Sequence, residues 1–182
     1  MNKALIQSVM LREIRWVDPT DNFADALVIQ TYVYNVQLEN YMNLPWYSKL
    51  LVAPPEAPLR FSGDSSTGLG QIFAKTAVNA LNWYFEGLGC EVQYNYGDIH
   101  QAYEIWDKLR TDDVFNIDMV GLVLLYGAEA PGELDLNINT IAPIEIRKIL
   151  ARYNGFGSAA AQYGNEVYEY YECFLRYNNS RR

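Results

Sequence analysis

Glu13 is the first residue whose type and spacing could do acid–base chemistry. It lies seven positions after Ile6 and three after Met10, so in a helix its carboxyl group shares the apolar face. Burial disfavours the ionised carboxylate and raises its pKa, which is the property required of a general acid near neutral pH. The same spacing also fits a glutamate at the edge of that face that reaches solvent and pairs with Arg12 or Arg15.

A glycine-rich segment, "DSSTGLGQIFAKTA" at 64–77, is the second candidate. Gly68 and Gly70 would let a ligand or another backbone segment approach closely, and the amide of Gln71 can both donate and accept hydrogen bonds. The alternative is a turn that leads into an ordinary helix, with one of the hydroxyl residues at 65–67 as its N-cap.

The third candidate is "RYNGFG" at 152–157, where one helix is expected to end and another to begin. Tyr153 and Asn154 fit either a binding corner or a tight turn between two helices. We expect the tyrosine-rich stripe that follows to belong to the core, because its members recur at helical spacing. These residues are Tyr163, Val167, Tyr170 and Phe174.

The order of the three segments resembles that of the lysozyme-like superfamily, particularly lytic transglycosylases and goose-type lysozymes. "ALIQSVMLREIRWVDP" resembles their helix that ends in the catalytic Glu, "STGLGQIFAKTA" resembles their Gly-Leu-Met-Gln segment with its trailing Thr-Ala, and "RYNGFG" resembles their Tyr-Asn-Ala-Gly segment. The resemblance implies that Glu13 is the general acid. The residues that it assigns to the substrate cleft are Gly68, Leu69, Gly70, Gln71, Tyr153 and Asn154.

The chain departs from this family pattern at three points. Ile14 stands where a Ser usually follows the catalytic Glu, and Gly70 stands where a Met usually precedes the Gln. Far more residues than usual separate Glu13 from Gly68. The long separation predicts an inserted helical segment at approximately 20–63, which would cover, narrow or block the cleft.

The activity that the resemblance implies is cleavage of peptidoglycan glycan strands between N-acetylmuramic acid and N-acetylglucosamine. Glu13 would protonate the bridging oxygen, and the cleft would stabilise an oxocarbenium-like transition state. In lytic transglycosylases the same Glu then accepts a proton as the muramic 6-hydroxyl attacks, so a second carboxylate is unnecessary. Peptidoglycan is the implied partner, and the reaction needs no cofactor.

Two further carboxylates are candidates for roles in this reaction. A hydrolytic, muramidase course needs a positioned water, and Asp64 is the candidate second carboxylate because it directly precedes the glycine-rich segment. Asp64 is equally suited to cap a helix or form an Asx-turn. Glu56 is the fallback acid, although its rigid "PPEAP" loop offers no apolar face to raise the pKa of the carboxyl.

Two alternatives belong to other functional classes. A lysozyme-like module without catalysis would bind glycan or a protein, such as a partner or an inhibitor, through the surface that 15 Tyr and 4 Trp provide. An interaction protein with an unrelated helical fold is the other alternative. In that second case, Glu13, Gln71 and Tyr153 would not converge on a common cleft.

The elements that must position these residues are mainly helices. We expect one all-α, lysozyme-like domain over 1–182, with a proline-rich loop at 46–66, a capped connection at 111–118, a short strand or extended loop at 92–96, and a loop at 127–143 that could carry a strand. The polar tail at 178–182 should fray. Helical patterns cover 3–16, 22–42, 71–85, 98–110, 119–126, 144–153 and 158–177.

Composition excludes several classes of function. The net charge of −8 disfavours nucleic-acid binding, which needs clustered cations. Cys90, Cys173 and the single histidine, His100, have no metal-binding spacing and form no Cys–His nucleophile system. The two thiols could form a disulfide in an oxidising compartment or stay reduced.

Targeting signals are not visible in the sequence. The longest apolar run, at 119–128, is shorter than the roughly 20 residues that a membrane-spanning helix needs. Charged residues interrupt the N-terminal apolar segment, so no signal peptide is predicted. These features are compatible with an excised catalytic domain, a phage lysin or an effector delivered by a secretion machine, each acting at the bacterial cell wall.

Overall fold

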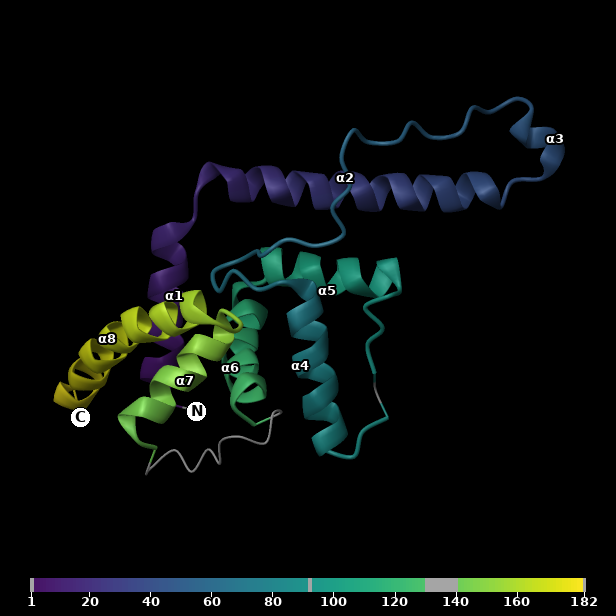
Figure 1. The fold of residues 1–182 in the computed structure, drawn as a ribbon. Coiled ribbons are helices and arrows are strands. Elements are labelled where there is room, and N and C mark those ends of the chain that lie inside the picture. The colour runs from purple at the N-terminus through teal and green to yellow at the C-terminus, as the bar shows by residue number, and fades with distance from the viewer. Residues whose placement is uncertain (1, 92, 130–140, 182) are drawn as a thin grey trace.

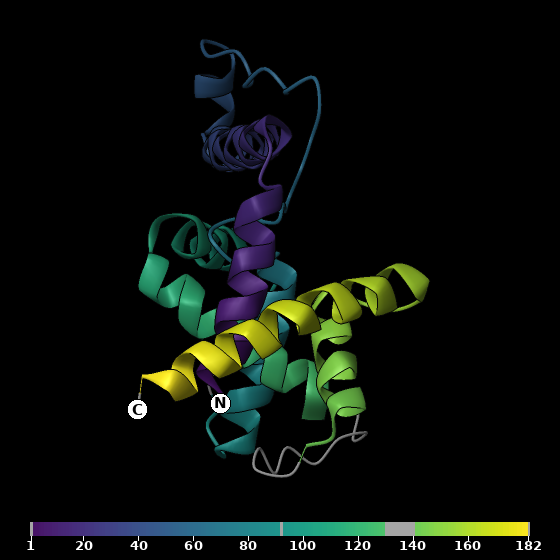
Figure 2. The ribbon, with the colours of Figure 1, turned by 90° about the vertical axis from the view of Figure 1, so that its left-hand side faces the viewer.

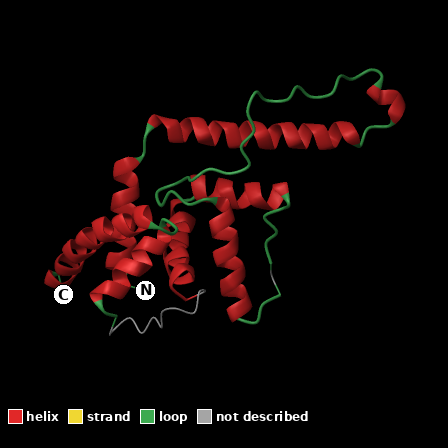
Figure 3. Ribbon diagram, viewed as in Figure 1, coloured by secondary structure: helices red, strands yellow, loops and turns green. Residues whose placement is uncertain are grey.

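The computed structural model describes residues 2–91, 93–129 and 141–181, and these form helices joined by loops (Figures 1 and 3). Within these ranges there is no strand, and the only β-type pairing is an isolated bridge between Thr67 and Ile72. The predicted mainly-α class is therefore confirmed. The helices are α1 (Lys3–Trp16), α2 (Pro19–Met42), α3 (Trp46–Lys49), α4 (Ala74–Gly87), α5 (Ile99–Thr111), α6 (Asp113–Glu129), α7 (Pro143–Tyr153) and α8 (Ser158–Ser180).

Helix α6 is the centre of the helical body. It packs against α1, α4, α5 and α7, while α8 lies across α1 and α7 (Figure 2). A helix with apolar residues on all sides requires such a central position. The sequence predicted a helix only from 119, but α6 begins at Asp113 because its first turns also pack into the body. The side chains that it buries include Asn116, Met119, Val120, Val123 and Leu124.

Helix α1 buries one face and carries Glu13 in its last turn. Asn2 caps its start by accepting a hydrogen bond from the backbone N–H of Ala4, and Leu5 and Val9 are buried. Glu13 follows these two residues at intervals of four, which places it on the same face. The helix has the bounds that the sequence predicts.

Other predicted boundaries also differ from those in the structure. The helix predicted to start at 71 starts at Ala74, because Gln71 and Ile72 belong to the preceding turn. Asp18 and Pro19 end the first helical pattern, but they also start α2, because Asp18 caps the helix and Pro19 occupies its first turn. Helix α8 continues to Ser180, beyond the predicted end at 177. The side chain of Asn178 donates a hydrogen bond to Gln7 on α1 over 2.8 Å, which orders part of the predicted frayed tail.

The sequence allowed either a short strand or an extended loop at 92–96, and residues 93–96 form a loop. The strand allowed within 127–143 falls largely on 130–140, outside the described residues. Cys90 and Cys173 are both exposed and unpaired. Among the described helices, none is both long and apolar enough to cross a membrane.

Helix α2, the short helix α3 and the loop that leads from α3 back toward α4 form an arm that projects from the helical body (Figures 1 and 2). This arm covers the residues that the sequence predicts as an insertion, and their status as an insertion stays a prediction. The returning loop is longer than most connections within a domain. Near its tip, the arm exposes large apolar side chains, which include Trp46, Leu50, Leu51 and Leu59.

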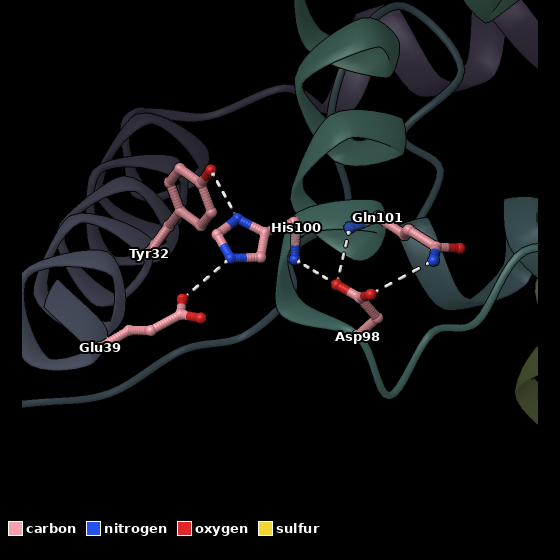
Figure 4. Close-up of polar contacts among 5 residues, drawn as sticks. All are labelled: Tyr32, Glu39, Asp98, His100 and Gln101. Carbon is pink, nitrogen blue, oxygen red and sulfur yellow. Dashed lines mark hydrogen bonds and ion pairs between the residues drawn. The ribbon is translucent and has the colours of Figure 1, made fainter. Parts of the chain in front are cut away.

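Helix α2 is attached to α5 through Tyr32 and His100. The ring of Tyr32 stacks on that of Tyr103 with centroids 3.7 Å apart, and its hydroxyl lies 3.2 Å from His100 Nδ1. His100 Nε2 lies 3.1 Å from a carboxylate oxygen of Glu39, so both ring nitrogens face α2 (Figure 4). Asp98 caps α5 at the same point. Contacts of Tyr32 and Glu39 with His100 and Tyr103 therefore connect the arm to α5.

Candidate functional site

Glu13 is partly buried between α1 and α8. One of its carboxylate oxygens accepts a hydrogen bond from the hydroxyl of Tyr163 over 2.6 Å. Burial raises the pKa of Glu13 above its ordinary value, although the hydrogen bond from Tyr163 and the charge of Arg12 act in the opposite direction. The nearby carboxylates of Glu166 and Asp21 raise that pKa further. The net shift favours the protonated acid.

Aromatic rings and an arginine surround this carboxyl group. The rings of Tyr153 and Tyr163 are nearly parallel with centroids 6.5 Å apart. The guanidinium of Arg12 lies over the rings of Trp16 and Tyr163, at 4.8 and 5.1 Å, and its Nε is 3.5 Å from a carboxylate oxygen of Glu166. Burial raises the pKa of both tyrosines, so their hydroxyls remain hydrogen-bond donors.

Tyr163 is a residue that the sequence assigned only to the core. Its ring is indeed buried, but its hydroxyl contacts Glu13, 150 positions away. A buried tyrosine needs a partner for its hydroxyl. A tyrosine at an otherwise apolar position of the α8 stripe was therefore a signal of a polar contact, but not of which contact.

The glycine-rich segment forms a tight turn closed by the bridge between Thr67 and Ile72. Gly68 and Gln71 both have positive φ angles, of 70° and 49°. The side chain of Gln71 folds back onto the turn, where its Nε2 donates to the carbonyl of Gly68 over 3.0 Å and its Oε1 accepts from Ser66 over 3.2 Å. These bonds fix the amide in one orientation.

Asn116 on α6 fastens the turn to the helical body. Its Oδ1 accepts from the backbone N–H of Gly70 over 2.7 Å, and its Nδ2 donates to the carbonyl of Leu109 over 2.9 Å. The hydroxyl of Tyr153 donates to the carbonyl of Gly70 over 2.7 Å. Asn116 is fully buried, and sequence reasoning missed it because it lies in a segment predicted as a connection. The turn, α6 and the end of α7 thus form one hydrogen-bonded unit.

A cleft of about 560 Å³, the Glu13 cleft, lies where these elements meet. Glu13, Gln71, Tyr153 and Asn154 all line it. The structure therefore brings together one residue or more from each of the three segments singled out in the sequence. Its other lining residues are Phe73, Thr76, Val123, Tyr126, Gly127, Arg152, Gly155 and Phe156.

The remaining predicted cleft residues lie beside the Glu13 cleft. Gly68 and Leu69 line a neighbouring groove, the α2 groove, which shares Gln71 with the Glu13 cleft. Gly70 is buried, with its N–H and carbonyl bound to Asn116 and Tyr153. Gly70 therefore stabilises the turn from its buried side.

Asp64 accepts hydrogen bonds from the first turn of α4, although the N-cap position of that helix is Phe73. Its two carboxylate oxygens accept from the backbone N–H groups of Ala74 and Lys75, each over 2.9 Å. Burial raises the pKa of this carboxyl in spite of those hydrogen bonds. Asp64 lines neither the Glu13 cleft nor the α2 groove. Glu56 is exposed and likewise lines neither.

Replacement of Asp64 with alanine should lower the free energy of unfolding by about 1–2 kcal/mol, because two backbone N–H groups of α4 lose their acceptor. The Asp64→Asn variant keeps one acceptor oxygen and should lose less. Urea denaturation measures both effects. Stability of Asp64→Ala equal to that of wild type would contradict this structural role.

The partly buried carboxyl of Glu13 should make stability depend on pH. Since its pKa is raised in the folded state, the folded protein binds the proton more tightly than the unfolded chain does. This tighter proton binding stabilises the fold at pH values below the pKa of Glu13 in the unfolded chain. The stabilisation is lost as the pH rises through the pKa of Glu13 in the folded protein. The uncharged Glu13→Gln variant lacks this pH dependence. The free energy of unfolding of the variant, relative to that of wild type, should therefore be larger at pH 7.5 than at pH 4.

Thermal unfolding of both proteins at the two pH values measures this difference. Glu169→Gln is the matched control, since it removes an exposed carboxylate from α8. A gain for Glu13→Gln that is no larger at pH 7.5 than at pH 4 would contradict the prediction.

The described residues contain no group of three or more His, Cys, Asp or Glu side chains placed to hold a metal ion. Comparisons of the chain with protein-family models, curated protein sequences and solved structures returned no match.

Proposed function

We propose that this protein cleaves the glycan strands of peptidoglycan, with Glu13 as general acid and base. The observation that carries the proposal is the position of Glu13. Its partly buried carboxyl has a raised pKa and lines a cleft together with Gln71, Tyr153 and Asn154. A perturbed carboxyl in a cleft is a candidate catalytic group. The order of these residues along the chain resembles that in lytic transglycosylases and goose-type lysozymes.

The reaction begins with transfer of the Glu13 proton to the oxygen of the glycosidic bond. As the C–O bond breaks, positive charge develops on the sugar ring, and the Glu13 carboxylate left behind stabilises it. Tyr163 donates its hydrogen bond to one carboxylate oxygen. The second oxygen is then the one that carries the proton toward the substrate.

For the second half of the reaction, the carboxylate content of the Glu13 cleft favours the lytic course. Among the described residues, Glu13 is the only carboxylate that lines the Glu13 cleft itself, while Asp21 and Asp25 line the neighbouring α2 groove. A hydrolytic enzyme that works through a second carboxylate needs it near the scissile bond. In the lytic course, the muramic 6-hydroxyl attacks C1 of the same sugar and its proton passes to Glu13, which restores the acid and leaves a 1,6-anhydro end.

Other groups in the Glu13 cleft suit an N-acetylated amino sugar. Tyr126 and Phe156 offer aromatic surface to sugar rings, and the amides of Gln71 and Asn154 match N-acetyl groups in hydrogen-bonding capacity. Arg152 also lines the cleft, with its guanidinium 4.4 Å from the centre of the Phe156 ring.

Digestion of purified peptidoglycan, followed by mass analysis of the released fragments, tests the proposal. We expect fragments that end in anhydro-muramic acid from the wild-type protein, and release from Glu13→Gln that is slower by about 10²- to 10⁴-fold. Reducing ends would indicate the hydrolytic course. If wild type releases nothing from walls of several compositions but still sediments with them, the protein is a glycan-binding module instead of an enzyme.

A further inference from the structure

The α2 groove has a volume of about 610 Å³ and shares Gln71 with the Glu13 cleft. Ile14, the residue after Glu13, lies in its wall, so the two cavities flank the end of α1. We infer that the α2 groove holds the continuation of the glycan strand and that α2 is the wall that contacts its sugars. The inference rests on the proposed function and adds a second part to the same substrate site.

One face of α2 forms this wall. Asn22, Ala26 and Ile29 line the groove at intervals of three and four residues, which places them on one side of the helix. Asp25, on the same face, accepts hydrogen bonds from the hydroxyls of Ser65 and Thr67, over 2.7 and 2.9 Å. These bonds tie the wall to the turn that carries Gln71.

A further hydrogen bond ties the same turn to the body. The indole Nε1 of Trp106, a fully buried residue on α5, donates to the hydroxyl oxygen of Ser65 over 3.0 Å. Farther along α2, His100 contacts Tyr32 and Glu39 (Figure 4). Because α2 is held at both places, the groove is a preformed feature of the fold. Such preorganisation lowers the cost of binding.

The lining of the α2 groove combines surfaces that suit a saccharide. Ile14 and Val17 leave 48% and 49% of their surface exposed and offer apolar contact to the faces of sugar rings. Asp21, Asn22 and Arg110 supply charged and polar groups beside them. Each cavity alone has the size of a small-molecule site. Two such cavities that share Gln71 favour a polymer that runs through both over a single small ligand.

Ala26→Trp tests the inference because a large side chain at this exposed position of the wall would fill the groove. Gln30→Trp is the matched control: Gln30 is also exposed, lies four residues farther along α2, and lines neither cavity. Both substitutions are made in the Glu13→Gln background, so that glycan binding is measured without cleavage. Thermal unfolding of each variant checks that α2 remains folded.

The probe is soluble, undigested peptidoglycan strands, and the readout is the dissociation constant. We expect Ala26→Trp to weaken binding roughly ten-fold or more, because the indole occupies the space of the sugars, while Gln30→Trp leaves binding unchanged. Equal affinities for the two tryptophan variants, or no strand binding by Glu13→Gln itself, would overturn the inference. The proposed function is tested separately, by comparing the fragments that wild type and Glu13→Gln release from peptidoglycan.

Discussion

Replacement of Glu13 with glutamine should reduce kcat for peptidoglycan cleavage by about 10²- to 10⁴-fold, the usual contribution of a general acid. Glutamine keeps the shape of the side chain and can still accept the hydrogen bond from Tyr163, but it has no proton to deliver to the leaving oxygen. Strand binding should therefore survive while turnover is lost. Release of soluble fragments measures the rate, and sedimentation with intact walls measures binding.

Glu166→Gln is the matched control for this substitution. Glu166 lies on α8 next to Arg12 and influences the pKa of Glu13, but it does not line the Glu13 cleft. Its replacement should shift the pH dependence of cleavage without abolishing it, since one carboxylate that raises the pKa of Glu13 is removed. Full activity of Glu13→Gln would eliminate the proposed mechanism and direct attention to Glu56, the fallback acid.

Gly68→Ala should destabilise the fold by about 2–4 kcal/mol. A Cβ at this position would lie 2.2 Å from the carbonyl oxygen of Leu109 and 2.2 Å from Nδ2 of Asn116, where the backbone oxygen cannot easily move away. Overpacking of this kind costs about 1–3 kcal/mol. The φ angle of 70° adds about 1 kcal/mol for a residue that has a Cβ.

Gly63→Ala is the comparison that isolates this effect. A Cβ at Gly63 would meet no atom within 4 Å, and its φ angle lies outside the positive range. Urea denaturation should therefore show a loss of stability for Gly68→Ala and almost none for Gly63→Ala. Similar stabilities of the two variants would mean that the turn is not packed against Asn116 and Leu109 as the structure describes.

Local sequence patterns were sufficient to predict most helices and the position of Glu13 on α1. The prediction used the spacing of Glu13 from Ile6 and Met10, and in the structure the fully packed members of that face are Leu5 and Val9, at intervals of four. Asp98 at the start of α5 follows from the preference of short polar side chains for N-caps. Such signals depend only on neighbouring residues, so a single sequence is enough to read them.

Boundaries were less predictable where packing or an alternative cap decides them. Asp18 and Pro19 can end one helix or begin another, and in this chain they do both. The sequence around Asp113 resembles a connection, yet it forms the first turn of α6 because the following apolar residues pack against several other helices. Tertiary packing overrides local preference at such sites.

The sequence by itself determined the helical class, the apolar face that carries Glu13 and the need for glycine in the turn at 68–70. Only the tertiary structure decided that Tyr163 is the partner of Glu13, that Asn116 fastens the turn, and that α2 walls a second groove. The contacts of Glu13, of Asn116 with Gly70 and of Asp25 join residues 40 to 150 positions apart. No periodicity or capping pattern encodes them, since they depend on how whole helices pack.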